Sequence, residues 1–473
     1  ADWGRGLGAA DWTAVRFTVT QALVSAGLSC LLAIPVARAL ARRRFWGRSV
    51  LVTLLGAPFL LPVIVAVLGL LAVFGRNGIL NDALGALGLP EVSIYGFHGV
   101  VLAHVFFNLP LVTRLILQGW LSIPAERFRL AASLDAPVGR LLERPMLRTV
   151  LPPAFLIVFL ICLTSFAVAL TLGGGPRATT VELAIYQALR FDFDLGRAAM
   201  LASIQFGLCS IAAALAWRMT AVDGFGAGLD RSVDRWDGSR WGDAVVIALA
   251  ATFLLVPLIM VIVRGVPGLL ELPVDILWAA LRSVTIAIIS AGLCIGLTLA
   301  LALKGGRIVG LVGVLPLATS SLVVGTGLFL LVYPIVNPAK LALVVTALVN
   351  AVLALPFALR SVAPAVDKIT SDYARLGAIL DMSTWVWTTR VILPRLRRPL
   401  GFAAGLAAAL SMGDLGVIAL FAGDAQETLP LAMYRLMGAY RMDAAAGAAL
   451  MLLVLSFALF WICDRGGRVD ADL

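Results

Sequence analysis

The residues from Tyr373 to Pro394 read YARLGAILDMSTWVWTTRVILP, a polar stretch between two apolar ones that ends on Val-x-Leu-Pro. A weaker copy of this stretch, RFRLAASLD, lies upstream from Arg127 to Asp135. The two copies align with Asp135 on Asp381, and each follows an apolar stretch long enough to span a membrane. A polar loop that occurs twice among apolar stretches indicates a chain built from two similar halves.

The match between the halves continues upstream of the loops without a gap. The segment HVFFNLPLVTR, from His104 to Arg114, lies over NAVLALPFALR, from Asn350 to Arg360. An alignment that holds over roughly thirty positions indicates an internal repeat. We therefore expect a first half over residues 1–217 and a second half over residues 243–473. Residues 218–242, which are rich in Gly, Asp and Arg, are expected to form a cytoplasmic linker.

The composition assigns the chain to the membrane. Its 473 residues are 61% hydrophobic and 14% charged, with a mean hydropathy of +1.00, whereas a soluble chain is about 25% charged. The net charge of +10 does not indicate nucleic-acid binding, because basic residues in a membrane protein report its orientation. The five Cys show no paired spacing and there are two His, so no metal or cofactor is expected on this chain.

The sequence predicts an all-α polytopic membrane protein with eleven visible transmembrane helices. A helix of roughly 20 apolar residues crosses a bilayer core. Such stretches lie near residues 17–40, 50–74, 98–118, 148–172, 198–217, 243–264, 278–303, 308–332, 341–361, 400–421 and 444–463. The first half has one span fewer than the second, and Ala1–Arg16 aligns with the segment after the sixth span. We therefore expect that a twelfth, N-terminal helix is missing from this sequence.

Charge distribution predicts the orientation of these spans. When the two polar loops are placed in the cytoplasm, most of the 37 Lys and Arg lie on the cytoplasmic side, as the positive-inside rule requires. The run Arg42-Arg43-Arg44 is the sharpest local marker, and we interpret it as a stop-transfer anchor. The opposite orientation would invert this bias, so both loops are predicted to be cytoplasmic.

Each polar loop has the pattern of a short amphipathic helix. Leu376, Ile379 and Leu380 form one apolar stripe, while Ser371 and Asp372 occupy the position expected for the start of a helix. An ordinary helix at the membrane surface would show the same stripe. Because the pattern is repeated, we favour a docking helix that inserts into a groove of a partner protein.

The second loop resembles the cytoplasmic EAA loop of ABC-importer permeases. That loop ends in Ile-x-Leu-Pro and carries a Gly ten residues before the Ile; here Val391, Leu393 and Pro394 form the ending, and Asp381 replaces the Gly. Arg375 stands at the position of the Glu. The first copy departs further, because its ending is replaced by Arg144 to Leu147, after a deletion of about three residues. The resemblance implies that both loops bind the ATPase subunits.

The residues that this resemblance places at the ATPase interface fall in two groups. In the first loop they are Arg129, Leu130, Ala131, Leu134 and Asp135. In the second loop they are Arg375, Leu376, Gly377, Ala378, Leu380, Asp381, Val391, Leu393 and Pro394. No Walker sequence occurs in the chain, so we expect a transport subunit that is not itself an enzyme.

Four longer runs resemble the fused, two-half permease of the bacterial thiamine ABC importer. They are LAHVFFNLPLVTRL at 102–115, LGGGPRATTVELAIYQAL at 172–189, SMGDLGVIALF at 411–421 and TLPLAMYRLMGAYRMD at 428–443. The resemblance covers essentially the whole chain. It implies a type I ABC-importer-like permease in the bacterial inner membrane.

The same resemblance implies a substrate and partners. The substrate would be thiamine, together with its phosphate esters, delivered by a periplasmic thiamine-binding protein. A homodimeric ATP-binding subunit would hold ATP and magnesium and dock under the two loops. Iron(III) importers share the fused organisation with two loops, so an iron(III) permease is the nearest alternative substrate class.

Asp414 is an acidic residue inside the apolar span 400–421, between Gly413 and Gly416. An ionisable residue at membrane depth is costly and points to function, so it could face the translocation path of a cationic substrate such as thiamine. A structural hydrogen bond to a neighbouring helix is the competing interpretation. When the deletion is allowed for, Ser165 is its counterpart in the first half, and we predict both as path residues.

An ion-coupled secondary transporter is the alternative from another functional class. It would be expected to carry several paired acidic residues at the membrane midplane and would not need cytoplasmic docking helices. Asp414 is the one clearly acidic residue within a predicted span, and the loops are repeated. The sequence therefore favours the ATP-driven importer.

Overall fold

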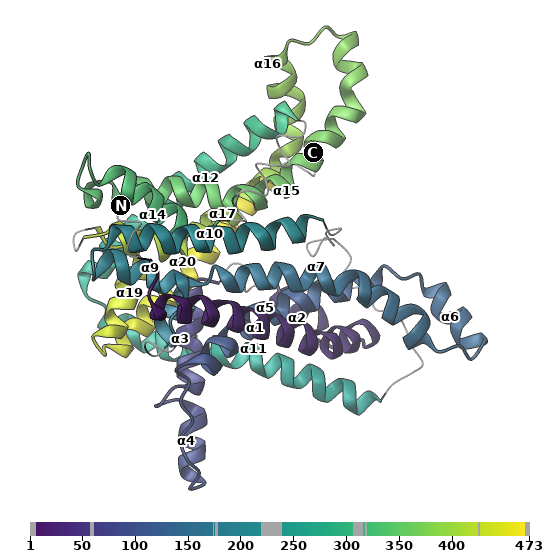
Figure 1. The fold of residues 1–473 in the computed structure, drawn as a ribbon. Coiled ribbons are helices and arrows are strands. Elements are labelled where there is room, and N and C mark those ends of the chain that lie inside the picture. The colour runs from purple at the N-terminus through teal and green to yellow at the C-terminus, as the bar shows by residue number, and fades with distance from the viewer. Residues whose placement is uncertain are drawn as a thin grey trace. The chain divides into compact units, whose positions relative to one another are not determined.

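A computed structural model gives the arrangement of the helices. It describes residues 6–56, 61–173, 175, 178–218, 239–305, 316, 319–423 and 426–468. Within these ranges the chain forms helices and no strand, which confirms the all-α prediction (Figure 1). Most of the linker predicted at 218–242 lies outside the described ranges.

The described elements form two series along the chain, which share part of their order. The first series is α1 (Ala9–Arg42), α2 (Arg48–Leu54), α3 (Val63–Phe74), α4 (Ile79–Ala86), α5 (Phe97–Leu121), α6 (Ala125–Ser133), η3 (Gly139–Glu143), α7 (Arg144–Leu163), α8 (Phe166–Leu172), α9 (Val181–Arg190) and α10 (Leu195–Trp217). The second is α11 (Arg240–Gly268), η5 (Leu269–Glu271), α12 (Val274–Lys304), α14 (Ser321–Val332), η7 (Pro338–Leu341), α15 (Ala342–Ile379), α16 (Thr384–Val386), η8 (Trp387–Ile392), α17 (Leu393–Met412), α18 (Gly416–Phe421), α19 (Leu429–Gly438) and α20 (Met442–Arg468). The long helices α7 and α17 have the same length, 20 residues, and each follows a π-helical segment.

Ten helices in the described ranges are long and apolar enough to cross a membrane. The sequence predicted eleven spans, and the difference lies in the span expected at 308–332. Its first part is outside the described residues, and its described part is α14, a helix of 12 residues that is shorter than a full span. The polytopic membrane architecture is confirmed.

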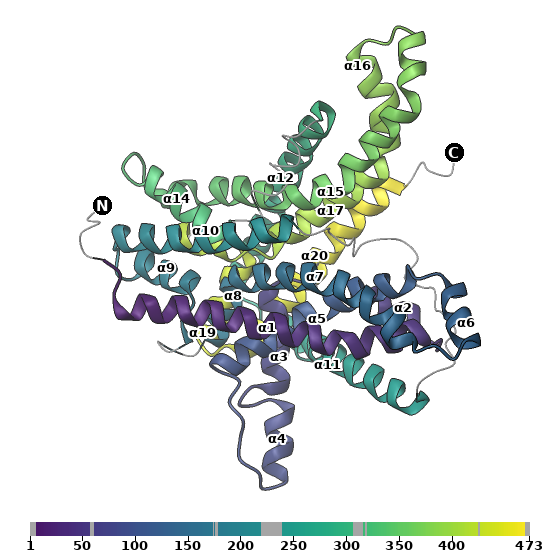
Figure 2. The same ribbon diagram turned by 45° about the vertical axis from the view of Figure 1, so that its right-hand side comes forward.

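The chain separates into two compact units, and the division falls within α3, α9, α10 and α11. Unit 1 contains residues 1–59, 66–187 and 203–263, and unit 2 contains residues 60–65, 188–202 and 264–473. In unit 1, α1 packs along both α5 and α7, and these two also touch each other (Figure 2). In unit 2, α12, α15 and α17 form the corresponding group, and α20 packs along α17. Each unit therefore has a core of three long helices.

Small residues let long helices approach closely in each unit. In unit 1, a Cβ added at Gly69 would lie 2.6 Å from the carbonyl oxygen of Pro257 in α11. In unit 2, a Cβ at Gly268 would lie 2.1 Å from the carbonyl oxygen of Asp443. Close approach at small residues is how membrane helices pack when lipid gives no hydrophobic drive for association.

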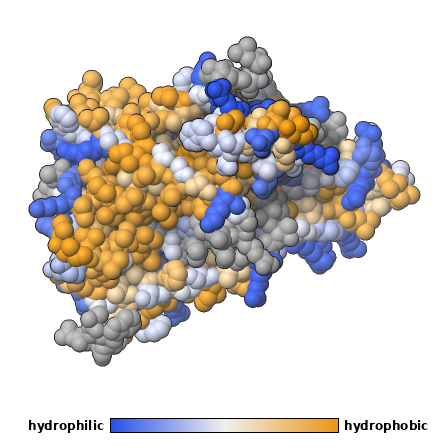
Figure 3. All heavy atoms as spheres, turned by 90° about the horizontal axis from the view of Figure 1, so that it is seen from above, coloured by the Kyte–Doolittle hydropathy of each residue, from blue (hydrophilic) through white to orange (hydrophobic). Residues whose placement is uncertain are grey.

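The outward surfaces of the long helices are apolar, as lipid contact requires. Exposed side chains on α12 include Leu277, Leu281, Ile288 and Ile289. Figure 3 shows a broad field of apolar side chains on the face that it draws, with polar side chains toward its margins. A soluble protein seldom exposes an apolar surface of this extent.

Candidate functional site

The first predicted docking loop contains a separate short helix, α6. Pro124 precedes it and lies at its N-cap position, so α6 begins after a break from α5. At its other end, the amide of Ala136 donates to the carbonyl of Ala131 (2.8 Å) and the amide of Asp135 donates to the carbonyl of Ala132 (3.3 Å). This pair of bonds is a Schellman motif, which ends a helix with a left-handed residue. Asp135 has that conformation, with a φ of 47°.

The second predicted loop ends its helix in the same way. The amide of Met382 donates to the carbonyl of Gly377 (3.0 Å), and that of Asp381 donates to the carbonyl of Ala378 (3.3 Å). Asp381 has a φ of 44°, so it repeats the left-handed conformation of Asp135. The two loops therefore share a local structure as well as a sequence pattern.

The start of the second loop differs from our expectation. A new helix was expected at Ser371 and Asp372, but α15 runs without interruption from Ala342 to Ile379. The reason lies in the aligned position, where the first half has Pro124 and the second half has Thr370. Proline disfavours helical conformation in the residue before it and cannot donate a helical hydrogen bond, whereas threonine continues the helix.

The apolar stripes of both loops are exposed. Four leucines of the two stripes have between 49% and 68% of their residue surface exposed: Leu130 and Leu134 in the first loop, and Leu376 and Leu380 in the second. An exposed apolar face on a short helix outside the membrane is what helix-in-groove binding uses. The arginines and aspartates predicted beside these leucines are also exposed. They are Arg129, Asp135, Arg375 and Asp381.

Three of the predicted interface residues are placed differently. Ala131 and Val391 are buried within the protein, and Gly377 is turned toward Trp387. A Cβ added at Gly377 would lie 2.7 Å from the ring of Trp387, so the glycine allows the returning limb of the loop to rest on α15. These residues hold the shape of the loops. Ala378, Leu393 and Pro394 retain partial or full exposure.

The returning limb of the second loop is also held by an aromatic contact. The guanidinium of Arg395, at the start of α17, lies 4.3 Å from the centre of the Tyr373 ring in α15. A cation over an aromatic ring is attracted by the charge distribution of the ring. Together with the Trp387 contact, this pair fixes η8 and α17 against the end of α15.

A buried polar network joins the three core helices of unit 2. The side-chain amide of Asn350 in α15 donates to the hydroxyl of Ser411 in α17 (3.0 Å), which donates to the hydroxyl of Ser290 in α12 (3.1 Å). Interhelical hydrogen bonds of this kind help membrane helices associate. The helices that carry the second loop are thus cross-linked at membrane depth.

Unit 1 carries a related network. The hydroxyl of Ser25 in α1 lies 3.3 Å from Nδ1 of His104 in α5, and Asn108 donates to the sulfur of Cys162 in α7 (3.5 Å). His104 occupies the position aligned with Asn350. The same three-helix junction is therefore polar in both units, with different side chains.

The two predicted path residues lie at matching breaks in the membrane helices. Ser165 separates α7 from α8, and Asp414 lies between α17 and α18. One carboxylate oxygen of Asp414 accepts a bond from the amide of Gly416 (3.3 Å). The other is buried and has no hydrogen-bond partner among the described residues. Neither position is tested by this geometry, and both remain predicted path residues.

Comparison with known proteins finds relatives that match nearly the whole chain. No protein-family model matches it. The thiamine transport system permease protein ThiP of Escherichia coli (strain K12) is 42% identical to it over 98% of this chain and 90% of the relative.

The chain belongs to the family of thiamine transport system permeases. ThiP proteins of Brucella abortus (strain 2308) and Haemophilus influenzae are 40% and 34% identical, over 96% and 94% of this chain and 87% of each relative. The sulfate permease CysW of Synechococcus elongatus is 30% identical, over 26% of this chain. The thiamine permease relatives therefore span both halves, and they are transport permeases rather than enzymes.

Proposed function

We propose that this chain is the membrane-spanning subunit of an ATP-driven importer of thiamine and its phosphate esters in the bacterial inner membrane. The observation that carries the proposal is the similarity to thiamine transport permeases over nearly the whole chain. These relatives do not favour the alternative of an iron(III) permease. A periplasmic thiamine-binding protein would deliver the substrate.

The two loops are the proposed docking sites for a homodimeric ATP-binding subunit, which would hold ATP and magnesium. The support is their shared local structure: each ends a short amphipathic segment at a left-handed aspartate and exposes two leucines. Two similar helices suit two identical grooves, one on each copy of the ATPase. Closure of the ATPase dimer would then move both loops and switch the permease between its inward-open and outward-open states.

Asp414 and Ser165 are the proposed path residues. The support is their position at the two breaks in the long helices, together with the carboxylate oxygen of Asp414 that lacks a hydrogen-bond partner among the described residues. Breaks in membrane helices free polar groups for a substrate, and a carboxylate oxygen without a hydrogen-bond partner suits a cation. Thiamine is a cation. Because Asp414 is acidic and Ser165 is neutral, the second half would be the one that interacts with the positive charge of the substrate.

The test is the ATPase activity of the purified permease with its ATP-binding subunit in lipid. Stimulation by thiamine-loaded binding protein, with no stimulation by the empty form, supports the proposal. The double substitution Leu376→Asp and Leu380→Asp should abolish this stimulation, because a charge in the apolar stripe prevents insertion into a groove. Leu376→Met with Leu380→Met is the matched control and should retain it.

The other outcomes also decide between functions. Stimulation by a ferric-loaded binding protein would replace thiamine with iron(III) as the proposed substrate and leave the proposed mechanism unchanged. Failure to form a complex with any ATP-binding subunit would overturn the importer proposal. The ion-coupled carrier would then be tested by thiamine uptake driven by an ion gradient alone.

A further inference from the structure

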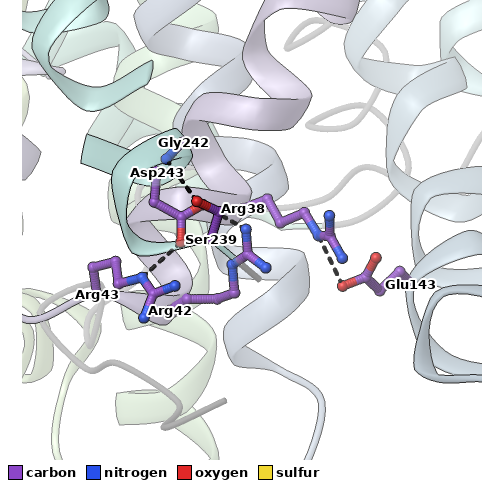
Figure 4. Close-up of polar contacts among 7 residues, drawn as sticks. All are labelled: Arg38, Arg42, Arg43, Glu143, Ser239, Gly242 and Asp243. Atoms are coloured by element: carbon purple, nitrogen blue, oxygen red, sulfur yellow. Dashed lines mark hydrogen bonds and ion pairs between the residues drawn. The ribbon is translucent and has the colours of Figure 1, made fainter. Parts of the chain in front are cut away.

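The C-terminal end of α1 is tied to the start of α11 by two neighbouring arginines, of which Arg42 is buried and Arg43 is half-buried. Arg42 Nη2 lies 2.5 Å from Asp243 Oδ1, and Arg43 Nε lies 2.6 Å from Asp243 Oδ2 (Figure 4). The side chains of Arg42 and Asp243 are only 6% and 7% exposed. One carboxylate therefore receives two arginines in a site from which water is largely excluded.

Asp243 is also held in place by hydrogen bonds within the start of its own helix. It lies in the first turn of α11, where its amide donates to the carbonyl of Ser239 (3.1 Å). The Ser239 hydroxyl accepts from the amide of Gly242 (3.2 Å). An acidic residue in the first turn also interacts favourably with the helix dipole. The arginines of α1 thus bind an aspartate that the start of α11 holds in place.

The same end of α1 is tied to the exit of the first docking loop. Arg38 Nε lies 3.2 Å from Oε1 of Glu143, the last residue of η3 (Figure 4). Arg38 lies one helical turn before Arg42, so the two side chains project from the same face of α1. The carboxylate of Glu143 is largely buried. A single turn of α1 therefore contacts two segments that lie more than a hundred residues from it in sequence.

We propose that Arg38, Arg42 and Arg43 are positioning residues, here called the arginine clasp, that make the first docking loop move together with α1 and α11. This inference rests on the proposed docking role of the loop. Separating the buried pair of Arg42 and Asp243 would leave an uncompensated charge, so this part of the clasp resists opening while ATP is hydrolysed. Movement imposed on α6 would then pass through η3 to α1 and from α1 to the cytoplasmic end of α11.

The second loop is anchored by different chemistry. Ile392, the last residue of η8, occupies the place that Glu143 has in η3, and it is buried. The exit of this loop rests on apolar packing and on the contact between Arg395 and Tyr373. We therefore expect charge substitutions at the clasp to affect the first loop and to leave the second loop unchanged.

A charge exchange tests the clasp in the complete importer. Arg38→Glu and Glu143→Arg, each alone, place like charges together; the two substitutions combined restore an ion pair with the partners exchanged. Each single variant should increase amide hydrogen exchange in residues 125–143 and lower the thiamine transported per ATP by about fivefold, the lower end of usual coupling between sites. The double variant should recover both quantities.

The pair between Arg76 and Glu91 provides a matched control. It has the same two residue types in unit 1, but its side chains are 85% and 62% exposed and lie 3.7 Å apart. Exposed pairs contribute little, so exchanging Arg76 and Glu91, singly or together, should change neither quantity. Asp243→Asn is a second clasp variant, and it should increase exchange at the start of α11.

The readouts separate failure of the clasp from failure of the docking proposal. Unchanged hydrogen exchange in the single clasp variants would overturn the clasp, and so would a folded double variant that fails to recover. If the loop does not dock the ATPase, Leu130→Asp with Leu134→Asp would leave ATPase binding intact. Hydrogen exchange in residues 125–143 would still report on the clasp in that case, because it does not depend on the partner.

Discussion

Asp135 and Asp381 have the same left-handed backbone conformation, with φ angles of 47° and 44°, at equivalent places in the two halves. Each lies directly after the end of a helix, and the amide of the residue that follows it donates a hydrogen bond to a carbonyl of that helix. The donor–acceptor distances are 2.8 Å for the amide of Ala136 and 3.0 Å for the amide of Met382. This is the position that carries glycine in the EAA pattern. The requirement there is conformational: a residue that tolerates positive φ ends the predicted docking helix.

We predict that Asp381→Gly preserves transport and leaves stability equal or slightly higher, because glycine adopts positive φ without a steric penalty. Asp381→Val should destabilise the loop by about 1 kcal/mol, because a β-branched residue tolerates positive φ less well than aspartate does. Thermal inactivation of the purified complex measures both changes. Equal inactivation rates for the Gly and Val variants would contradict the conformational explanation.

Gly377→Ala should weaken ATPase binding through the shape of the second loop. The added methyl would lie 2.7 Å from the Trp387 ring, and overpacking of this kind costs about 1 to 3 kcal/mol. Trp387→Leu in the same chain should relieve the clash and restore part of the binding. The affinity of the ATP-binding subunit for each variant in detergent or lipid is the measurement.

Gly292→Ala is the control for this experiment. A Cβ at Gly292 meets nothing within 4 Å, so the same change in α12 should leave binding unaffected. If Gly377→Ala behaves like Gly292→Ala, the Trp387 contact does not determine the loop.

The sequence predicted the loops and their repetition because both depend on local patterns. The positions of the apolar stripe and of the final aspartate could be aligned between Arg127–Asp135 and Tyr373–Pro394. The uninterrupted α15 could also have been anticipated, since Thr370 replaces Pro124 in the alignment. The absence of proline at this position indicates a continuous helix, whereas the apolar pattern alone does not show whether the helix is interrupted.

The remaining features depend on contacts between distant segments, which periodicity does not report. The Arg42–Arg44 run was interpreted as a membrane anchor, and no local pattern connected Arg42 with Asp243. The same holds for Ser290 and Ser411, which are isolated polar residues in apolar spans and meet only in the folded unit 2. The span expected at 308–332 lies partly outside the described residues, and its described part is the 12-residue helix α14.

Thr18 and Ser283 should be equivalent helix-capping residues in the two units. The amide of Val181, at the start of α9, donates to the Thr18 hydroxyl (2.9 Å), and the amide of Leu429, at the start of α19, donates to the Ser283 hydroxyl (2.8 Å). Thr18→Val and Ser283→Ala remove these acceptors and should each destabilise the permease by about 1 kcal/mol. Thr18→Ser retains the hydroxyl and should be neutral, as measured by thermal inactivation of the purified protein. A Thr18→Val variant as stable as Thr18→Ser would show that the bond contributes nothing.

Asp414→Asn should lower thiamine transport by about tenfold, which corresponds to about 1.4 kcal/mol of lost substrate stabilisation. Asparagine retains an oxygen for the amide of Gly416, at 3.3 Å from Asp414 Oδ1, so the break between α17 and α18 should persist. Assembly with the ATP-binding subunit and basal ATP hydrolysis should therefore remain, while uptake of thiamine into proteoliposomes falls. Ser165→Ala, at the equivalent break of the first half, is the comparison variant: it removes a proposed path residue without changing the charge, so it should lower uptake less than Asp414→Asn does. Unchanged uptake by Asp414→Asn would remove Asp414 from the path and leave it with a structural hydrogen bond.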